Sequence, residues 1–142
     1  MKIDKKGSAS WSGNLKEGRG AISTESGALK EHPYGFAQRF EGVRGSNPEE
    51  LLGAAHAACF TMALSMILGE AKLTAEKLTT GATVTLEKKG EGFEITQIHL
   101  KLEGKVPGAT AEQFKELAMN AKNGCPVSKL FKAEITLDVK LV

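Results

Sequence analysis

The chain has 142 residues and a formal net charge of +2, with 19 basic and 17 acidic side chains interspersed along it. This length is enough for one domain with a substantial core, so we expect residues 1–142 to form a single domain. The near-even charge balance argues against a nucleic-acid-binding protein, and no apolar run follows the N-terminal lysines as in a secretory signal, so we expect a cytoplasmic protein.

The first part of the chain predicts short strands and a loop. Strand-forming residues occur around residues 9–11 and 20–24, with glycines marking turns between them. Residues 24–33 are polar and rich in turn formers, which predicts a loop. Over residues 34–42 the alternation of Phe36, Gln38 and Phe40 with Ala37, Arg39 and Glu41 predicts a strand, with Arg39 on the face opposite the phenylalanines.

The next segment, residues 47–69, predicts one long helix. Asn47 is a favourable N-cap, Pro48 suits the first helical position, and Glu50 falls three residues after the cap. The helix is apolar on almost every face, which is typical of a helix that is covered all round. One small sheet cannot cover all of these faces, and a second subunit would supply the missing surface, so we expect a homodimer.

The same segment raises the question of a membrane span. No charged residue occurs from Leu51 to Leu68, a length close to that of a transmembrane helix. Gly53, His56, the alanines before Cys59 and the lack of a flanking basic cluster favour a core helix of a soluble protein instead. We therefore expect no membrane partner.

The rest of the chain predicts a hairpin, two helices and a last strand. A short connector precedes a hairpin over residues 82–102, in which a phase slip near Gln97 predicts a β-bulge. Thr110 opens an amphipathic helix that ends at residues 123–124, a short helix follows with Cys125 at its cap, and residues 133–141 alternate as a strand. This order of elements indicates an α+β fold with a largely antiparallel sheet.

The chain has two cysteines, Cys59 and Cys125, separated by 66 residues. In a cytoplasmic protein they are more often free, redox-active or metal-binding than a permanent disulfide, and two unrelated buried thiols remain an alternative. Physical chemistry favours Cys125 as the ionised thiol, because free N–H groups and the positive end of a helix dipole converge at its position. Cys59 lies in an apolar helix, where desolvation should raise its pKa unless a cation reaches it.

A reactive Cys59 therefore requires a nearby arginine. Arg19, Arg39 and Arg44 are the candidates, although most arginines are solvated surface charges, and we select Arg39. Glu49 is the natural carboxylate to orient it, unless it is only a favourable acid in the first helical turn. Glu49 and Cys59 are ten residues apart on one predicted helix, which is a distance of about 15 Å. Either the arginine bridges part of that distance, or a partner subunit contributes one of the two groups.

His56 lies three residues before Cys59 and could activate the thiol as a Cys–His pair. A lone histidine in an alanine-rich helix is more often a hydrogen-bonded core residue. A zinc site made of His56, Cys59 and Cys125 would lack an obvious fourth ligand, and we expect no metal. The sequence contains no phosphate-binding loop, dinucleotide fingerprint or Ser-His-Asp arrangement.

Six short motifs together resemble the osmotically inducible protein C (OsmC) family. They are TESGAL, PYGF, RFEG, NPEEL, AAHAACF and GCPVS at residues 24–29, 33–36, 39–42, 47–51, 54–60 and 124–128. The resemblance covers essentially the whole chain and is closer to the OsmC branch than to the organic hydroperoxide resistance (Ohr) branch. It implies an intertwined α+β homodimer with a long buried central helix and two active sites at the subunit interface.

The resemblance also implies a function and its residues. The protein would be a cysteine peroxidase that reduces organic hydroperoxides, with Cys59 as the peroxidatic cysteine and Cys125 as the resolving cysteine. Arg39 and Glu49 would hold the reactive thiolate, so the resemblance overrules the choice of Cys125 as the nucleophile. The Ohr branch uses an arginine nearer the N-terminus, which would fall near Arg19.

In the implied mechanism Cys59 becomes a sulfenic acid, Cys125 condenses with it to a disulfide, and an external dithiol reduces the disulfide. A lipoylated protein is the expected reductant, and no metal, haem or flavin cofactor is required. An apolar wall drawn from Phe36, Phe40, Phe60 and Met62 would favour organic peroxides over hydrogen peroxide. The alternatives are a non-catalytic stress or ligand-binding protein and a thiol–disulfide exchange protein.

Overall fold

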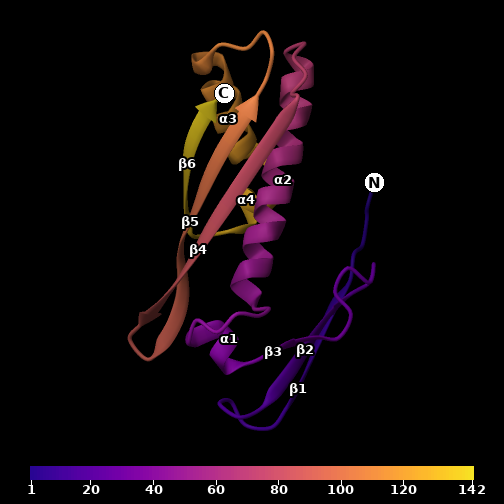
Figure 1. The fold of residues 1–142 in the computed structure, drawn as a ribbon, viewed down its shortest axis with the longest axis vertical. Helices are drawn as coiled ribbons and strands as arrows, with labels where there is room; N and C mark the ends of the chain where they lie inside the picture. Colours follow the sequence, from indigo (N-terminus) through magenta and orange to yellow (C-terminus); the bar gives the residue numbers. More distant parts are fainter. The chain divides into compact units, whose positions relative to one another are not determined.

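The computed structural model describes residues 1–142 and divides into two compact units, Met1–Leu51 and Leu52–Val142. Each unit contains its own three-stranded sheet, as Figure 1 shows. That the whole of residues 1–142 behaves as one domain remains a prediction.

The sheet of the first unit is an antiparallel meander. Strands β1 (Gly7–Ser12), β2 (Arg19–Thr24) and β3 (His32–Tyr34) follow one another in the order β1-β2-β3. β1 and β2 confirm the two strands expected at the start of the chain, whereas β3 begins within the predicted loop. Trp11 packs edge-on against Tyr34 with ring centroids 5.6 Å apart. Gly20 is required between them, because a Cβ atom there would lie 2.3 Å from the Tyr34 ring.

The strand predicted over residues 34–42 is wrong. After β3 the chain forms a short helix, α1 (Phe36–Phe40). Phe36 and Phe40 are four residues apart, which places them on one face of a helix as readily as on one face of a strand. Their ring centroids lie 5.0 Å apart, and the Arg39 guanidinium lies 5.3 Å from the centre of the Phe40 ring. Arg39 is therefore beside a phenylalanine and not opposite the pair.

The long helix is α2 (Pro48–Glu70), whose N-terminus lies in the first unit and whose main part belongs to the second. The Oδ1 atom of Asn47 accepts a hydrogen bond from the backbone N–H of Glu50 at 2.8 Å, which confirms the predicted cap. In the second unit β4 (Lys77–Lys89) and β5 (Gly92–Lys105) form the expected antiparallel hairpin. Thr85 pairs with Gln97 and Leu86 with Ile95, so the predicted β-bulge is present, with Thr96 as the extra residue.

In the last part of the chain, two helices connect β5 to a final strand of the same sheet. Helices α3 (Ala111–Gly124) and α4 (Pro126–Leu130) separate β5 from β6 (Glu134–Leu141). The Thr110 hydroxyl accepts from the Gln113 N–H and confirms the predicted cap of α3. β6 pairs with β5 in parallel, because a crossover connection containing helices joins parallel neighbours. The expected largely antiparallel sheet is therefore a mixed sheet.

One face of this sheet carries the core of the second unit. Side chains from α2, β5 and α3 meet there, each at most 1% exposed: Phe60, Leu64, Leu68, Ile98, Leu100, Leu102, Phe114, Ala118 and Ala121. The opposite face carries polar residues, including the contact between His99 and Asp138. Figure 1 shows α2 running along the sheet. The molecule thus has the α+β architecture with a long central helix that the sequence predicts.

The face of α2 that points away from this core is open. Met62 and Met66 are 76% and 63% exposed, whereas Phe60, Leu64 and Leu68 of the same helix are fully buried. The length of α2 and its mean hydropathy of 1.8 would by themselves allow it to cross a membrane, but core helices of soluble proteins have the same properties. Its packed side makes α2 a core helix.

Candidate active site

The two cysteines lie next to each other. Cys59 projects from the middle of α2, and Cys125 occupies the junction between α3 and α4. Both are free thiols, and their Sγ atoms are 2.8 Å apart. Cys125 is fully buried, whereas Cys59 is partly exposed. A disulfide requires a sulfur separation of about 2.05 Å, so oxidation could join the two residues with little movement of the backbone.

The surroundings of the two thiols shift their pKa values in opposite directions. Burial raises the pKa of Cys59, and the hydrogen bond that it shares with Cys125 raises it further. Burial also opposes ionisation of Cys125, but its polar interactions with Cys59 and with the first turn of α4 outweigh burial and lower the pKa of Cys125. This order confirms the expectation drawn from helix geometry and desolvation alone. Within the Leu52–Val142 unit, Cys125 is the more acidic thiol.

His56 belongs to the same buried cluster but is bonded to a different residue. Its Nε2 atom lies 2.7 Å from the Ser128 hydroxyl, and its ring packs against Phe131 with centroids 5.4 Å apart. Burial lowers the pKa of His56 and keeps the ring neutral. The interpretation of His56 as a hydrogen-bonded core residue is confirmed. The residues that would have formed a zinc site do not gather into a group of metal ligands.

Ser128 is the member of this cluster that sequence reasoning missed. It is 8% exposed and forms a hydrogen bond with His56. Its position in the first turn of α4, three residues after Cys125, was the available signal, because residues three apart in a helical turn are neighbours. Nothing in the sequence indicated that His56, 72 residues earlier, would meet it.

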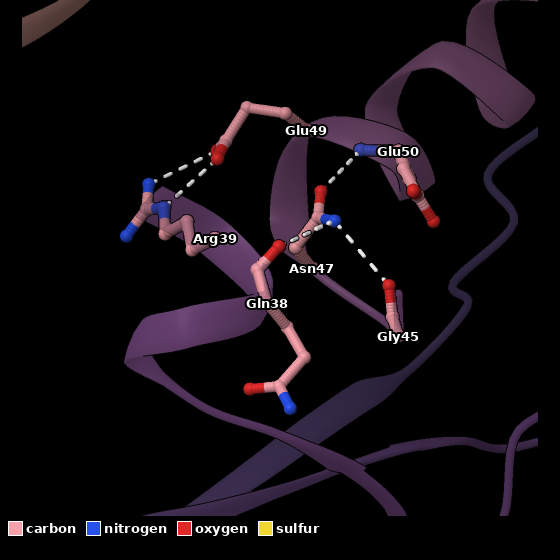
Figure 2. Close-up of polar contacts among 6 residues, drawn as sticks. All are labelled: Gln38, Arg39, Gly45, Asn47, Glu49 and Glu50. Atoms are coloured by element: carbon pink, nitrogen blue, oxygen red, sulfur yellow. Dashed lines mark hydrogen bonds and ion pairs between the residues drawn. The ribbon is translucent and has the colours of Figure 1, made fainter. Parts of the chain in front are cut away.

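Arg39 and Glu49 form a second constellation, within the Met1–Leu51 unit. The Nε and Nη2 atoms of Arg39 donate to the two carboxylate oxygens of Glu49 at 2.8 and 3.0 Å, as Figure 2 shows. Glu49 is mostly buried, whereas the Arg39 side chain is 37% exposed. A bidentate pair of this kind fixes the guanidinium plane and leaves Nη1 free to meet a further acceptor.

Asn47 organises the backbone around this ion pair. Its amide nitrogen donates to the carbonyl oxygens of Gln38 and Gly45, while its Oδ1 atom caps α2 (Figure 2). These bonds tie the end of α1 to the start of α2, which are the two helices that carry Arg39 and Glu49. The sequence predicted the pairing of Arg39 with Glu49 and the cap at Asn47, but not this bracing role.

The other expected side chains are dispersed. Arg19 and Arg44 are exposed and line a hollow of about 430 Å³ in the first unit, without a carboxylate bound to either. Phe36 and Phe40 lie together on α1. Phe60, expected as part of a substrate-facing wall, is instead fully buried in the core of the second unit.

Comparison with known proteins agrees with this architecture. Residues 41–140 match the model of the OsmC-like protein family. Peroxiredoxin OsmC of Escherichia coli (strain K12) is 57% identical over 141 residues, which cover 99% of both chains. Among solved structures, an OsmC-like protein of unknown function from Vibrio cholerae shares the fold with a TM-score of 0.78, at 15% identity over 97% of this chain and 99% of that one.

The structure of the organic hydroperoxide resistance protein OhrB of Bacillus subtilis is also similar. Its TM-score is 0.68 at 25% identity, and the match covers 96% of this chain and 98% of that one. The family model spans most of the chain, and the identity to the Escherichia coli protein extends over nearly all of it. The chain therefore belongs to the OsmC family.

Proposed function

We propose that this protein is a thiol peroxidase that reduces organic hydroperoxides to alcohols. The observation that carries the proposal is the contact between the Cys59 and Cys125 sulfurs, 2.8 Å apart. It is supported by the 57% identity to peroxiredoxin OsmC of Escherichia coli and by the similarity to organic hydroperoxide resistance proteins. A pair of incidental thiols in a non-catalytic binding protein would have no reason to meet across 66 residues of sequence.

The chemistry needs only the two sulfurs and the substrate. The Cys59 thiolate attacks the terminal oxygen of the hydroperoxide, so that an S–O bond forms, the O–O bond breaks and the alkoxide leaves as an alcohol after protonation. The Cys125 thiolate then attacks the sulfenic sulfur, which forms the S–S bond and releases hydroxide, which is protonated to water. Cys59 is assigned the first step because it is partly exposed, whereas Cys125 is fully buried.

Cys59 needs a cation to act as a thiolate at neutral pH, since burial raises its pKa. We assign this role to Arg39, oriented by its bidentate bond to Glu49. Ten residues of one helix separate Glu49 from Cys59, about 15 Å at the usual rise per residue. An arginine fixed to Glu49 cannot also bridge that distance, so the arginine that serves each Cys59 comes from the partner subunit.

The protein is accordingly proposed to act as a homodimer. The open face of α2 is apolar, and a groove of about 640 Å³ runs between this face and β4. Ala57, Ala58 and Met62 line the groove. An apolar surface of this kind is seldom left open on a monomer, and a second copy of the chain would cover it.

The catalytic cycle ends with reduction of the Cys59–Cys125 disulfide. An external dithiol can complete this exchange in two steps. Its first thiol forms a mixed disulfide with one protein cysteine, and its second thiol then attacks the first sulfur, which oxidises the dithiol to a disulfide and releases the protein cysteine as a thiolate. A dihydrolipoyl group on a lipoylated protein is such a dithiol and is the reductant we propose. We also propose a cytoplasmic location, because protein thiols and dithiols are kept reduced in the cytoplasm.

The first test is a free-thiol count on the reduced protein before and after one equivalent of cumene hydroperoxide, with hydrogen peroxide in parallel. We expect rapid loss of both thiols with the organic peroxide, slower loss with hydrogen peroxide, and no peroxide consumption by the Cys59→Ser variant. Survival of both thiols would favour a binding protein of the same fold. Reduction of disulfides with no activity on peroxides would instead indicate a thiol–disulfide exchange protein.

A further inference from the structure

The outer face of α4 combines a basic side chain with an exposed apolar one. Pro126, Lys129 and Leu130 are exposed, whereas Ser128 is buried and Val127 is half-buried. Residues three and four apart lie on one face of a helix, so the three exposed side chains share the side of α4 that meets solvent. Leu130, a large apolar side chain, is 73% exposed. This face therefore offers an apolar contact beside a positive charge.

The charge of this part of the chain has one sign. Lys122, Lys129 and Lys132 are the only charged residues from residue 117 to residue 133. None of the three forms an ion pair with a carboxylate in the structure. The whole chain has 19 basic and 17 acidic side chains, so the rest of the chain carries no excess of positive charge. The excess positive charge of the protein therefore lies in this segment.

The basic segment lies beside the thiol pair. Cys125 is the residue before α4, and the backbone N–H of Lys129 donates to its carbonyl oxygen at 3.1 Å. One helical turn, a rise of about 6 Å along the axis, therefore separates Lys129 from Cys125. The Cys125 sulfur is 2.8 Å from that of Cys59, which is partly exposed while Cys125 is fully buried. An external thiol therefore reaches the pair at Cys59, and the protein that carries this thiol comes close to α4.

We propose that Pro126, Lys129, Leu130 and Lys132 form a docking surface for an acidic protein that carries the reducing dithiol. This inference rests on the proposed function, because docking serves the reduction of the active-site disulfide. A dihydrolipoyl group joined to its carrier through an amide has no charge, so the lysines of the docking surface attract the carrier protein and not the dithiol itself. A carrier with acidic residues around its lipoyl group matches this surface in charge, and opposite charges speed the encounter of two proteins.

The docked dithiol transfers two electrons to the protein. One dihydrolipoyl thiolate attacks the Cys59 sulfur, so that a mixed S–S bond forms, the Cys59–Cys125 bond breaks and Cys125 leaves as a thiolate. The second dihydrolipoyl thiolate then attacks the lipoyl sulfur of the mixed disulfide, which closes the lipoyl disulfide and releases Cys59 as a thiolate. The docking surface takes no part in these bonds. It holds the carrier while they are exchanged.

Charge separates the two halves of the catalytic cycle. An alkyl hydroperoxide such as cumene hydroperoxide is uncharged at neutral pH, so Lys129 and Lys132 have no charge to attract in the first half. An acidic carrier is attracted only in the second half. Leu130 adds an apolar contact, and protein interfaces commonly surround such a contact with a polar rim. Loss of the lysines should therefore slow the encounter with the carrier, and loss of the leucine should speed its release.

The reductive half can be measured by itself. The disulfide is formed with one equivalent of cumene hydroperoxide, and the oxidised protein is mixed with a reduced lipoyl domain of net negative charge or with free dihydrolipoamide. Acid quenching, alkylation and mass spectrometry then give the rate at which both thiols return. We expect Lys129→Glu combined with Lys132→Glu to slow reduction by the lipoyl domain about tenfold at low ionic strength, and much less in about 1 M salt. The rate with free dihydrolipoamide should stay the same.

A matched control is available at the turn of the β4–β5 hairpin. Lys88→Glu combined with Lys89→Glu changes the net charge by the same amount, and both dithiols should reduce this variant at the wild-type rate. Leu130→Ser leaves the net charge unchanged and should weaken binding of the lipoyl domain by a similar factor at low and high salt. All of these positions are exposed, so the substitutions should preserve the fold.

The outcomes separate this inference from the proposed function. An unchanged rate with the lipoyl domain in Lys129→Glu combined with Lys132→Glu, or an equal loss in the hairpin variant, would overturn the docking surface and leave the peroxidase intact. A parallel loss with free dihydrolipoamide would also overturn it, because the charges would then act on the disulfide itself. Failure of cumene hydroperoxide to oxidise the two cysteines would refute the peroxidase, and the docking surface would then be tested on the disulfide formed with diamide.

Discussion

The two units of the chain carry different parts of the proposed catalytic machinery. Met1–Leu51 holds all three arginines and the bidentate ion pair of Arg39 with Glu49. Leu52–Val142 holds both cysteines, together with the neutral pair of His56 and Ser128. The first site is charged and partly open to solvent, whereas the second is neutral and largely buried.

In the proposed mechanism neither unit is sufficient for a reactive Cys59. Hydrogen bonds within the thiol site favour the thiolate of Cys125, and burial disfavours that of Cys59. The second unit has no arginine with which to reverse this order. In the proposed dimer the first unit of one subunit supplies the missing charge, and peroxide reduction then depends on both units.

The largest expected effect is that of Arg39→Ala. Loss of an adjacent opposite charge changes a thiol pKa by about one to three units, so we expect the rate of peroxide consumption at neutral pH to fall by about 100-fold. The rate of Arg39→Lys should lie between those of the wild type and Arg39→Ala, because lysine keeps the charge but lacks the second donor of the guanidinium. Arg44→Ala is the control and should behave like the wild type. If Arg19→Ala instead lost a comparable rate of peroxide consumption while Arg39→Ala stayed active, Arg19 would be the residue that stabilises the thiolate.

Mixing two inactive variants shows which subunit supplies the arginine. A heterodimer of Arg39→Ala and Cys59→Ser chains contains one intact Cys59, on the chain that lacks Arg39. If the arginine comes from the partner subunit, co-refolding the two variants should restore part of the activity at one site per dimer. If the mixture stays as inactive as its components although heterodimers form, each Cys59 depends on the arginine of its own chain.

An intermediate effect is expected from charges on the open face of α2. Met62→Glu combined with Met66→Glu should leave the fold of one chain intact, since both side chains are exposed. In a dimer the same carboxylates would be buried against the partner. Sedimentation should therefore change from twice the 15.1 kDa chain mass to a single mass, and peroxidase activity should fall at low protein concentration.

Met119→Glu, on an exposed position of α3, is the matched control for the change in charge. It should leave both the mass and the activity unchanged. A wild-type protein that already sediments as a single chain would contradict the dimer directly. In that case the arginine of each site would have to come from its own chain.

Features set by local sequence were predicted well. The caps at Asn47 and Thr110 and the bulge at Thr96 depend on neighbouring residues, and the sequence predicts each within one position. The strand predicted over residues 34–42 failed because Phe36 and Phe40 are compatible with both periodicities in so short a segment. Reasoning from the residues also proposed Glu49 as the carboxylate that orients Arg39, and the two side chains do form a bidentate pair.

Features set by contacts across the fold could not be predicted. The parallel placement of β6 depends on which edge of the hairpin was free when the chain returned from α4. The bond between His56 and Ser128 depends on how α2 and α4 pack, because 72 residues separate the two side chains. By contrast, the direction of the difference in pKa between the two thiols could be predicted, because desolvation and backbone N–H groups act locally.

The smallest expected effect concerns stability and the neutrality of the thiol site. Burial lowers the pKa of His56 below its usual 6.5, so the unfolded chain binds a proton that the native protein does not. The free energy of unfolding should therefore be unaffected by His56 well above pH 6.5 and should fall as the pH decreases below it, until the lowered native pKa is reached. One proton limits this contribution to the slope to about 1.4 kcal/mol per pH unit.

Urea unfolding of the wild type and of His56→Gln between neutral and mildly acidic pH measures this contribution as the difference between the two slopes. The glutamine cannot titrate, so the curve of His56→Gln should be flatter than that of the wild type. Equal slopes for wild type and His56→Gln would mean that His56 accepts a proton in the native state. The thiol site would then contain a charge of its own, and the contrast between the two units would no longer account for the proposed dependence of Cys59 on Arg39.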